Sequence, residues 1–247
     1  MIDLTKPDQT ATIDLTKGTS DLEVRAQWVD NGDNSADNDD LDLRCSILFP
    51  GERMFLVDAG YRGDLNAMPY AYHHGDVTQA SADMPGEEII TVARDIAKKA
   101  GGPVALCFSV YSALSNGAVS VASLQPRMRM SFGNQVVNCK FDFREHPNAA
   151  DSTIYTYVIG YAIVTEDEVI LAPSGKTSKP HQEETAWLFW KDSSIEVEIV
   201  GPAVFKGAHQ KRADKYNSQA GITRRYENVG DGPSAGEKKG LLSGLFG

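Results

Sequence analysis

The chain has 247 residues, 41% of them apolar and 23% charged, which is enough to bury a large core as one domain or as one domain with an extension. Its formal net charge of −10 argues against a chain-wide nucleic-acid surface, because phosphate binding needs clusters of Lys and Arg. The opening Met-Ile-Asp-Leu is charged at once, unlike a secretory leader, and no apolar run approaches the roughly 18–20 residues of a membrane span.

The three cysteines, Cys45, Cys107 and Cys139, are widely spaced and odd in number, and they form no Cys-x-x-Cys pair. Each is surrounded by apolar residues, which favours small buried thiols over disulfides or metal ligands. Together with the missing leader and membrane span, this predicts a soluble, reduced, cytoplasmic protein with no transmembrane segment.

The N-terminal part of the chain alternates apolar and polar residues in short runs. The pentapeptide Ile-Asp-Leu-Thr-Lys occurs at residues 2–6 and again at 13–17, and each copy suits a half-buried strand. Residues 22–28 alternate in the same way. Residues 41–49 predict another strand, and residues 54–57 are its expected hairpin partner.

Further short strand patterns follow, with little helical periodicity. Residues 104–111 are continuously apolar, as in a strand at the centre of a sheet, and residues 96–100 predict a short helical turn. The remaining expected strands are residues 88–92, 119–124, 128–132 and 136–143, a hairpin of 154–164 with 168–172, and a hairpin of 187–190 with 195–200. The pattern predicts an all-β fold, a sandwich of two mostly antiparallel sheets with short helical turns and a C-terminal extension.

Two separate segments are rich in acidic oxygen donors. Residues 30–42 contain six Asp and three Asn, and a second acidic loop follows at residues 75–88. Ca²⁺ takes about 6–8 oxygen ligands, which carboxylates, amides and loop carbonyls supply. On composition alone a solvated turn is the commoner explanation, since Asp, Asn and Gly also form turns. The second cluster favours a calcium site.

Four ordered motifs resemble the TerD family of tellurium-resistance and stress proteins. They are the duplicated Ile-Asp-Leu-Thr-Lys, the Trp-Val-Asp of residues 28–30, the Leu-Asp-Leu-Arg-Cys-Ser of residues 41–46, and the second acidic loop with its following strand. Residues 108–111 continue the register. The resemblance covers roughly residues 10–172. Arg44, where a small residue is usual, and Val77, in place of Asn, depart from the family pattern.

The resemblance implies a β-sandwich that binds Ca²⁺ at adjacent sites on one end, without established catalytic activity. Members take part in tellurite tolerance and stress responses, often within larger assemblies near the membrane, so the implied partners are other proteins of such a complex. The resemblance implies calcium ligands at Asp30, Asp40 and Asp42 in the first loop and at Asp76, Asp83, Glu87 and Glu88 in the second.

The domain organisation expected from the sequence has three parts. Residues 1–172 form the TerD-like sandwich, residues 173–226 a β-rich extension that adds to or completes it, and residues 227–247 a flexible tail rich in Gly and Ser. The stretch 206–225 is locally basic, and the tail ends in an apolar Leu-Leu-Ser-Gly-Leu-Phe. These segments suit docking to a partner as well as a solvated surface and a frayed terminus.

The expected function is Ca²⁺-dependent binding or assembly in a stress response, not catalysis. One alternative is a non-catalytic adaptor of the same fold with a degenerate calcium site, which docks through its C-terminal segment. Another is a metal-dependent hydrolase using His73 and His74. This is disfavoured because zinc prefers three or four His or Cys ligands, and adjacent strand residues point to opposite faces. An EF-hand is excluded, since the first loop has no Gly at loop position 6 and no Glu at position 12.

Overall fold

The computed structural model describes residues 1–32, 39–51, 53–78, 80–81, 83–113, 117–140, 151–191, 194–199 and 225–226. The flexible tail predicted for residues 227–247 lies outside this part, as does the basic stretch apart from Arg225. None of the helices in the described ranges is long and apolar enough to cross a membrane.

The first of two large sheets in the described residues has seven strands in the order β1-β11-β10-β3-β8-β7-β6. Neighbouring strands are antiparallel except for β1 and β11, which are parallel. The bounds are β1 Ile2–Leu4, β11 Gln135–Cys139, β10 Arg127–Phe132, β3 Leu22–Trp28, β8 Gly86–Val92, β7 Ala71–His73 and β6 Gly63–Asp64.

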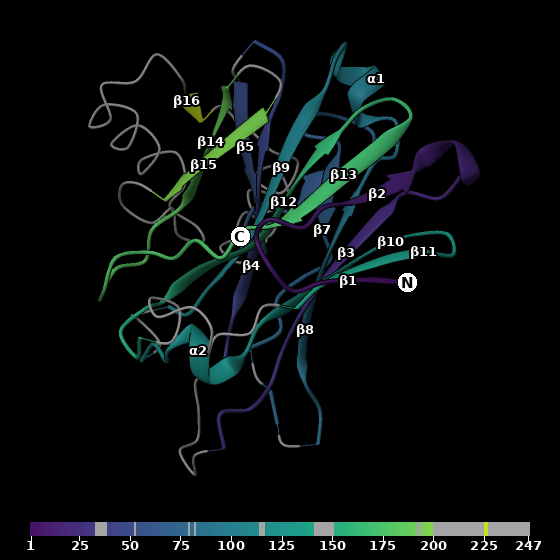
Figure 1. The fold of residues 1–247 in the computed structure, drawn as a ribbon. Coiled ribbons are helices and arrows are strands. Elements are labelled where there is room, and N and C mark those ends of the chain that lie inside the picture. Colours follow the sequence, from purple (N-terminus) through teal and green to yellow (C-terminus); the bar gives the residue numbers. More distant parts are fainter. Residues whose placement is uncertain are drawn as a thin grey trace, which may run out of the picture.

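The second sheet also has seven strands, in the order β16-β5-β4-β9-β12-β13-β2. All neighbours are antiparallel except β16 and β5. The bounds are β16 Arg225–Tyr226, β5 Arg53–Val57, β4 Asp42–Leu48, β9 Val104–Tyr111, β12 Thr156–Val164, β13 Glu168–Pro173 and β2 Ala11–Asp14. The two sheets pack face to face (Figure 1), which confirms the predicted all-β sandwich.

The core between the sheets follows from alternation along the strands. In β3 every second residue is buried, and Leu22, Val24 and Ala26 join the main apolar cluster. β9 is buried on both faces, as its continuous apolar sequence predicts. It lies between β4 and β12, so the expectation of a central strand is confirmed.

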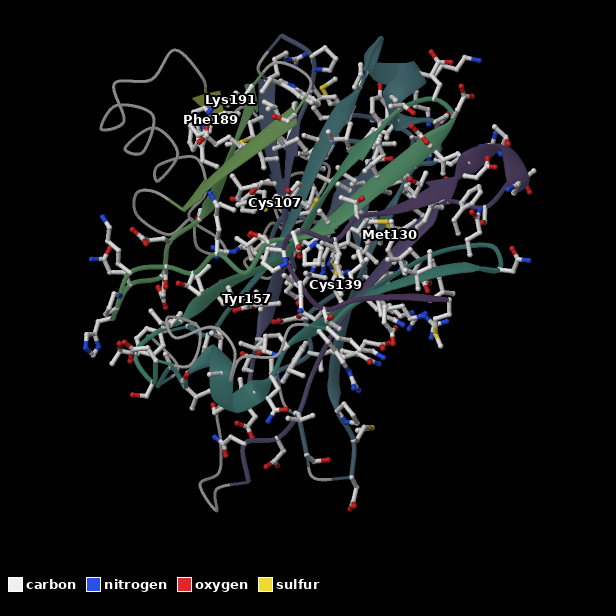
Figure 2. The ribbon with its side chains drawn as sticks, in the orientation of Figure 1. Cys107, Met130, Cys139, Tyr157, Phe189 and Lys191 are labelled. Atoms are coloured by element: carbon white, nitrogen blue, oxygen red, sulfur yellow. The ribbon has the colours of Figure 1, made fainter. Side chains whose placement is uncertain are left out.

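The C-terminal hairpin pairs β14 (Ala186–Lys191) with β15 (Ser194–Ile199) as a separate two-stranded sheet. It packs on the outer face of β4 and β9, where Trp187 is fully buried in a second apolar cluster with Cys107. Figure 2 shows Phe189 and Lys191 farther out on this hairpin, whereas Cys139 and Tyr157 lie nearer the middle of the molecule. The hairpin therefore forms a third layer beside the sandwich.

Two local predictions are wrong, each because a side chain caps a helical turn. Residues 119–124 were expected as a strand, but α2 (Val121–Leu124) is a helix whose Ser120 hydroxyl accepts a 3.2 Å hydrogen bond from the backbone of Ala122. The second pentapeptide copy ends its strand at Asp14. The Asp14 carboxylate accepts from the backbone of Thr16 at 2.9 Å, and the 3₁₀ helix η1 (Leu15–Lys17) follows.

Other local predictions are confirmed. The helical turn at α1 (Ile96–Ala100) ends at Gly101, whose φ of 73° is readily adopted by glycine. The expected hairpins β4–β5, β12–β13 and β14–β15 all form. The three cysteines are free and buried, and burial raises the pKa of the Cys107 and Cys139 thiols to about 12.

Candidate metal centre

Three carboxylates meet at one end of the sandwich. Asp42, Asp76 and Glu88 each offer an oxygen atom, and these atoms lie within 4.8 Å of one another. They come from three places in the chain: the first residue of β4, the loop between β7 and β8, and β8 itself. Asp42 and Glu88 are buried and Asp76 is exposed, so the group is open to solvent on one side.

The Glu88 side chain points between the sheets, because it lies on the same face of β8 as the buried Ile90 and Val92. Its carboxylate accepts two backbone hydrogen bonds, from Leu43 at 2.7 Å and from Val77 at 3.0 Å. A side chain of the first sheet therefore binds both β4 of the second sheet and the second acidic loop. Burial raises the pKa of Glu88 above its usual 4.5, against the opposing effects of His73 and these hydrogen bonds.

His73, the last residue of β7, supports Glu88 from inside the fold. Its side chain is fully buried, and its Nε2 lies 3.3 Å from Glu88 Oε2. Its Nδ1 accepts a 3.1 Å hydrogen bond from the backbone of Gly75, so in the neutral ring the proton is on Nε2, facing the carboxylate. His74 points the other way, with Nε2 2.8 Å from Thr91 Oγ1. The two histidines therefore occupy opposite faces, as predicted.

The two acidic loops are joined at the same end of the molecule. The carbonyl of Asp39 accepts hydrogen bonds from Trp28 Nε1 at 2.7 Å and from the backbone of Ala80 at 3.1 Å. The described residues on either side of these loops lie below β4 and β8 in the view of Figure 1. The indole of Trp28 also needs Gly86 opposite it, because a Cβ there would lie 2.1 Å from Trp28 Cε2.

The other predicted ligands lie outside the three-carboxylate group. Asp30 Oδ1 accepts a 2.6 Å hydrogen bond from the backbone of Gly32, and Asp40 is buried at the end of the first loop. Asp83 is exposed in the turn between Ser81 and Met84. The role of these three residues as ligands stays a prediction.

Glu87 faces the opposite side of β8 from Glu88. Its two carboxylate oxygens accept hydrogen bonds from Arg25 at 2.5 Å and from Gln27 at 2.6 Å. Both oxygens already have partners, the guanidinium of Arg25 and the amide of Gln27. To coordinate an ion in the three-carboxylate group, the Glu87 side chain would have to leave them and move to the opposite face of β8. Its role as a ligand also stays a prediction.

Tyr111 connects the group to the interior of the second sheet. It lies opposite Asp42 on β9, and burial raises the pKa of its hydroxyl, with a further rise from the Asp42 charge and hydrogen bond. The guanidinium of Arg44 lies 4.0 Å from the centre of the Tyr111 ring and donates to the carbonyl of Glu184 at 3.0 Å. Arg44, the departure from the family pattern, is thus a buried cation beside the acidic group.

His73, Asp39 and Tyr111 were not identified from the sequence as supports of this site. The sequence suggests His73 only as a metal ligand of a hydrolase. The signal available for it was its place in a short strand directly before the acidic loop, where one of two adjacent histidines must face inward. Tyr111 becomes a neighbour of Asp42 only through the β4–β9 register.

Comparison with known proteins assigns no family to the chain. No family model matches the chain, and no curated protein is significantly similar to it. Among solved structures, the chain is similar to one described as "Crystal structure of unknown function protein SAV2460", with 16% sequence identity and a TM-score of 0.46, over 66% of this chain and 93% of that chain.

Proposed function

We propose that this protein binds Ca²⁺ at Asp42, Asp76 and Glu88 and acts by calcium-dependent binding or assembly, not by catalysis. The observation that carries the proposal is the convergence of three carboxylates from both sheets and a loop within 4.8 Å. The resemblance of the sequence to the TerD family supports the same ion and a place in a stress-response or tellurium-resistance complex.

The chemistry of the donors favours a hard cation. All three groups are carboxylates, and Ca²⁺ accepts oxygen ligands in flexible geometry, whereas Mg²⁺ requires a near-ideal octahedron and keeps several waters. Protein zinc sites usually include nitrogen or sulfur donors, which this group of carboxylates lacks. His73 does not offer one, since its two ring nitrogens face Gly75 and Glu88.

Binding of the ion would change the local energetics in two ways. It would neutralise carboxylates that repel one another, and it would favour the ionised form of Glu88, whose pKa burial raises. Because Glu88 also holds the backbone of Leu43 and Val77, occupancy would stabilise the junction of β4 with the second acidic loop. Metal binding and local folding would then be coupled.

A calorimetric titration of chelator-stripped protein with Ca²⁺, with Mg²⁺ as the control ion, tests the proposal. Saturable Ca²⁺ binding at micromolar or tighter affinity, with little heat from Mg²⁺, supports it. Absence of saturable Ca²⁺ binding would overturn it and would favour the adaptor, in which the sandwich is kept and the acidic loops are only solvated turns.

A further inference from the structure

A basic hollow lies on the outer face of the first sheet, away from the carboxylates. Arg127 and Arg129 are exposed, alternating with the buried Met128 and Met130 along β10. The hollow has a volume of about 120 Å³. Its lining residues are Gln27, Arg127, Met128, Arg129, Asn138 and Lys140.

The cross-strand register gives the two arginines no acidic neighbour directly opposite. Arg127 is opposite Gln27 on β3, and Arg129 is opposite Arg25 on β3 and Asn138 on β11. Like charges opposite each other in a sheet are destabilising. Arg25 is neutralised by Glu23 and Glu87, at 2.7 Å and 2.5 Å.

By contrast, Arg127 and Arg129 make no side-chain hydrogen bond or ion pair to any residue in the described ranges. This is notable in a chain whose net charge is −10, where carboxylates outnumber cations. Two arginines without counter-charges on one strand, facing a hollow, form a surface that is short of an anion.

From this arrangement we propose that the hollow binds a phosphate group. Residues i and i+2 of a strand are about 6.6–6.8 Å apart on the same face, so two guanidinium groups can approach one tetrahedral oxyanion from neighbouring positions. The planar fork of Arg matches phosphate oxygens with paired N–H donors.

Lys140 and Asn138 complete the donor set and are held in place by the edge strand β1. Lys140 Nζ lies 3.0 Å from Asp3 Oδ2, and Asn138 Nδ2 donates to Asp3 Oδ1 at 2.6 Å. An ammonium has three donors, so Lys140 retains two when Asp3 accepts one. Asp3 orients these two side chains, and its negative charge also weakens the attraction of the hollow for an anion.

The experiment is an equilibrium titration at low ionic strength with a chelator present, so that no divalent ion mediates binding. The two probes are inorganic phosphate and adenosine monophosphate. The variants are Arg127→Gln and Arg129→Gln. The control is Arg53→Gln, which removes the same charge from an exposed arginine on β5 of the other sheet. Circular dichroism verifies that each variant is folded.

We expect saturable binding that weakens about tenfold or more in Arg127→Gln and Arg129→Gln but stays within about twofold of wild type in Arg53→Gln. Equal affinity for both probes would show that the phosphate group alone is recognised, and tighter nucleotide binding that the base or sugar adds contacts. Either result supports the site. No saturable binding of either probe, or an equal loss in the Arg53 control, would overturn it.

Asp3→Asn provides a variant with the opposite expected effect. Asn keeps an oxygen that can accept from Asn138, while a negative charge beside the hollow is removed. Affinity for phosphate should rise by about twofold, because the negative charge beside Lys140 no longer opposes that of the phosphate. A fall in affinity, in protein that is folded, would contradict the assignment of these residues to the site.

Discussion

Asp42→Asn and Asp76→Asn together would remove two of the three negative charges of the proposed calcium site with little change in side-chain size. Asn at position 42 keeps an oxygen that can accept from Tyr111, and position 76 is exposed, so both residues can be replaced without opening a cavity. Any change in calcium response can therefore be attributed to the lost charges.

The expected magnitude follows from ligand linkage. At a Ca²⁺ concentration of 100 times Kd, the wild-type protein gains about 2.7 kcal/mol. For a domain of this size that raises Tm by roughly 5–10 °C. Mutation of a residue that only supports a metal ligand lowers metal affinity by about 10- to 100-fold. The loss of two ligands should therefore weaken Ca²⁺ binding by about 10²- to 10⁴-fold or more. At the same concentration the gain then falls to about 0.4 kcal/mol or less.

The assay is thermal unfolding of the wild type and the double variant, each with chelator and with Ca²⁺ at the same concentration. The control variant, Asp8→Asn with Asp167→Asn, makes the same change in net charge at two exposed positions away from the group. It should keep the wild-type shift in Tm. A double variant of Asp42 and Asp76 that keeps the full shift would refute the assignment of these carboxylates as ligands.

Three further outcomes are expected. Burial raises the pKa of Glu88 in the folded protein above 4.5. Between pH 4.5 and that higher pKa, the folded protein without an ion therefore binds more protons than the unfolded chain. Its stability should fall as the pH rises through this window. Since Ca²⁺ binding releases that proton, calorimetric affinity should rise with pH over the same window, and a pH-independent affinity would contradict this. Glu87→Gln should leave Ca²⁺ affinity within about twofold in the same titration, because Glu87 contacts Arg25 on the other face, whereas a loss of about tenfold or more would place Glu87 among the ligands. Trp187→Ala should lower the free energy of unfolding by about 3–5 kcal/mol in urea denaturation, with the half-buried Trp190→Ala as the smaller comparison, and equal losses would show that the hairpin is not anchored by Trp187.

The regular strands could be predicted from the sequence because apolar and polar residues alternate along them, as expected for strands that are buried on one face. β3 has the same bounds as the predicted strand, and β9 was recognised by its apolar residues on both faces. The helix at α2 was missed because its apolar residues suit a strand equally well, and the hydroxyl of Ser120 decides between the two. A single capping group outweighs a weak pattern over a segment of four residues.

Long-range pairing could not be predicted in the same way. The two Ile-Asp-Leu-Thr-Lys copies look equivalent in sequence, but β1 joins the first sheet beside β11 and β2 joins the second beside β13. Their partners lie more than a hundred residues away along the chain. Local alternation fixes which face of a strand is buried and does not identify the neighbouring strand.

The choice of ligands was limited by the same problem of register. Glu87 and Glu88 are adjacent in a strand, so only one of them can face the core. The two isoleucines that follow, Ile89 and Ile90, do not show which face of the strand is buried, because one of them lies on each face. The structure places Ile90 and Val92 in the core and Glu88 with them. In the first loop, Asp42 joins the group because β4 begins at that residue, and its neighbour Asp40 does not.

The distribution of polar and apolar contacts indicates where an ion would act on the fold. The hairpin end is held by apolar packing around Trp187, which does not depend on charge. The loop end is held by Glu88, a desolvated carboxylate whose two backbone hydrogen bonds only partly offset the cost of its burial. A buried acid that weakens the apo fold is the arrangement expected where a cation completes a site. If the proposed calcium site is occupied, the effect of the ion on stability should therefore be concentrated at the junction of β4, β8 and the second acidic loop.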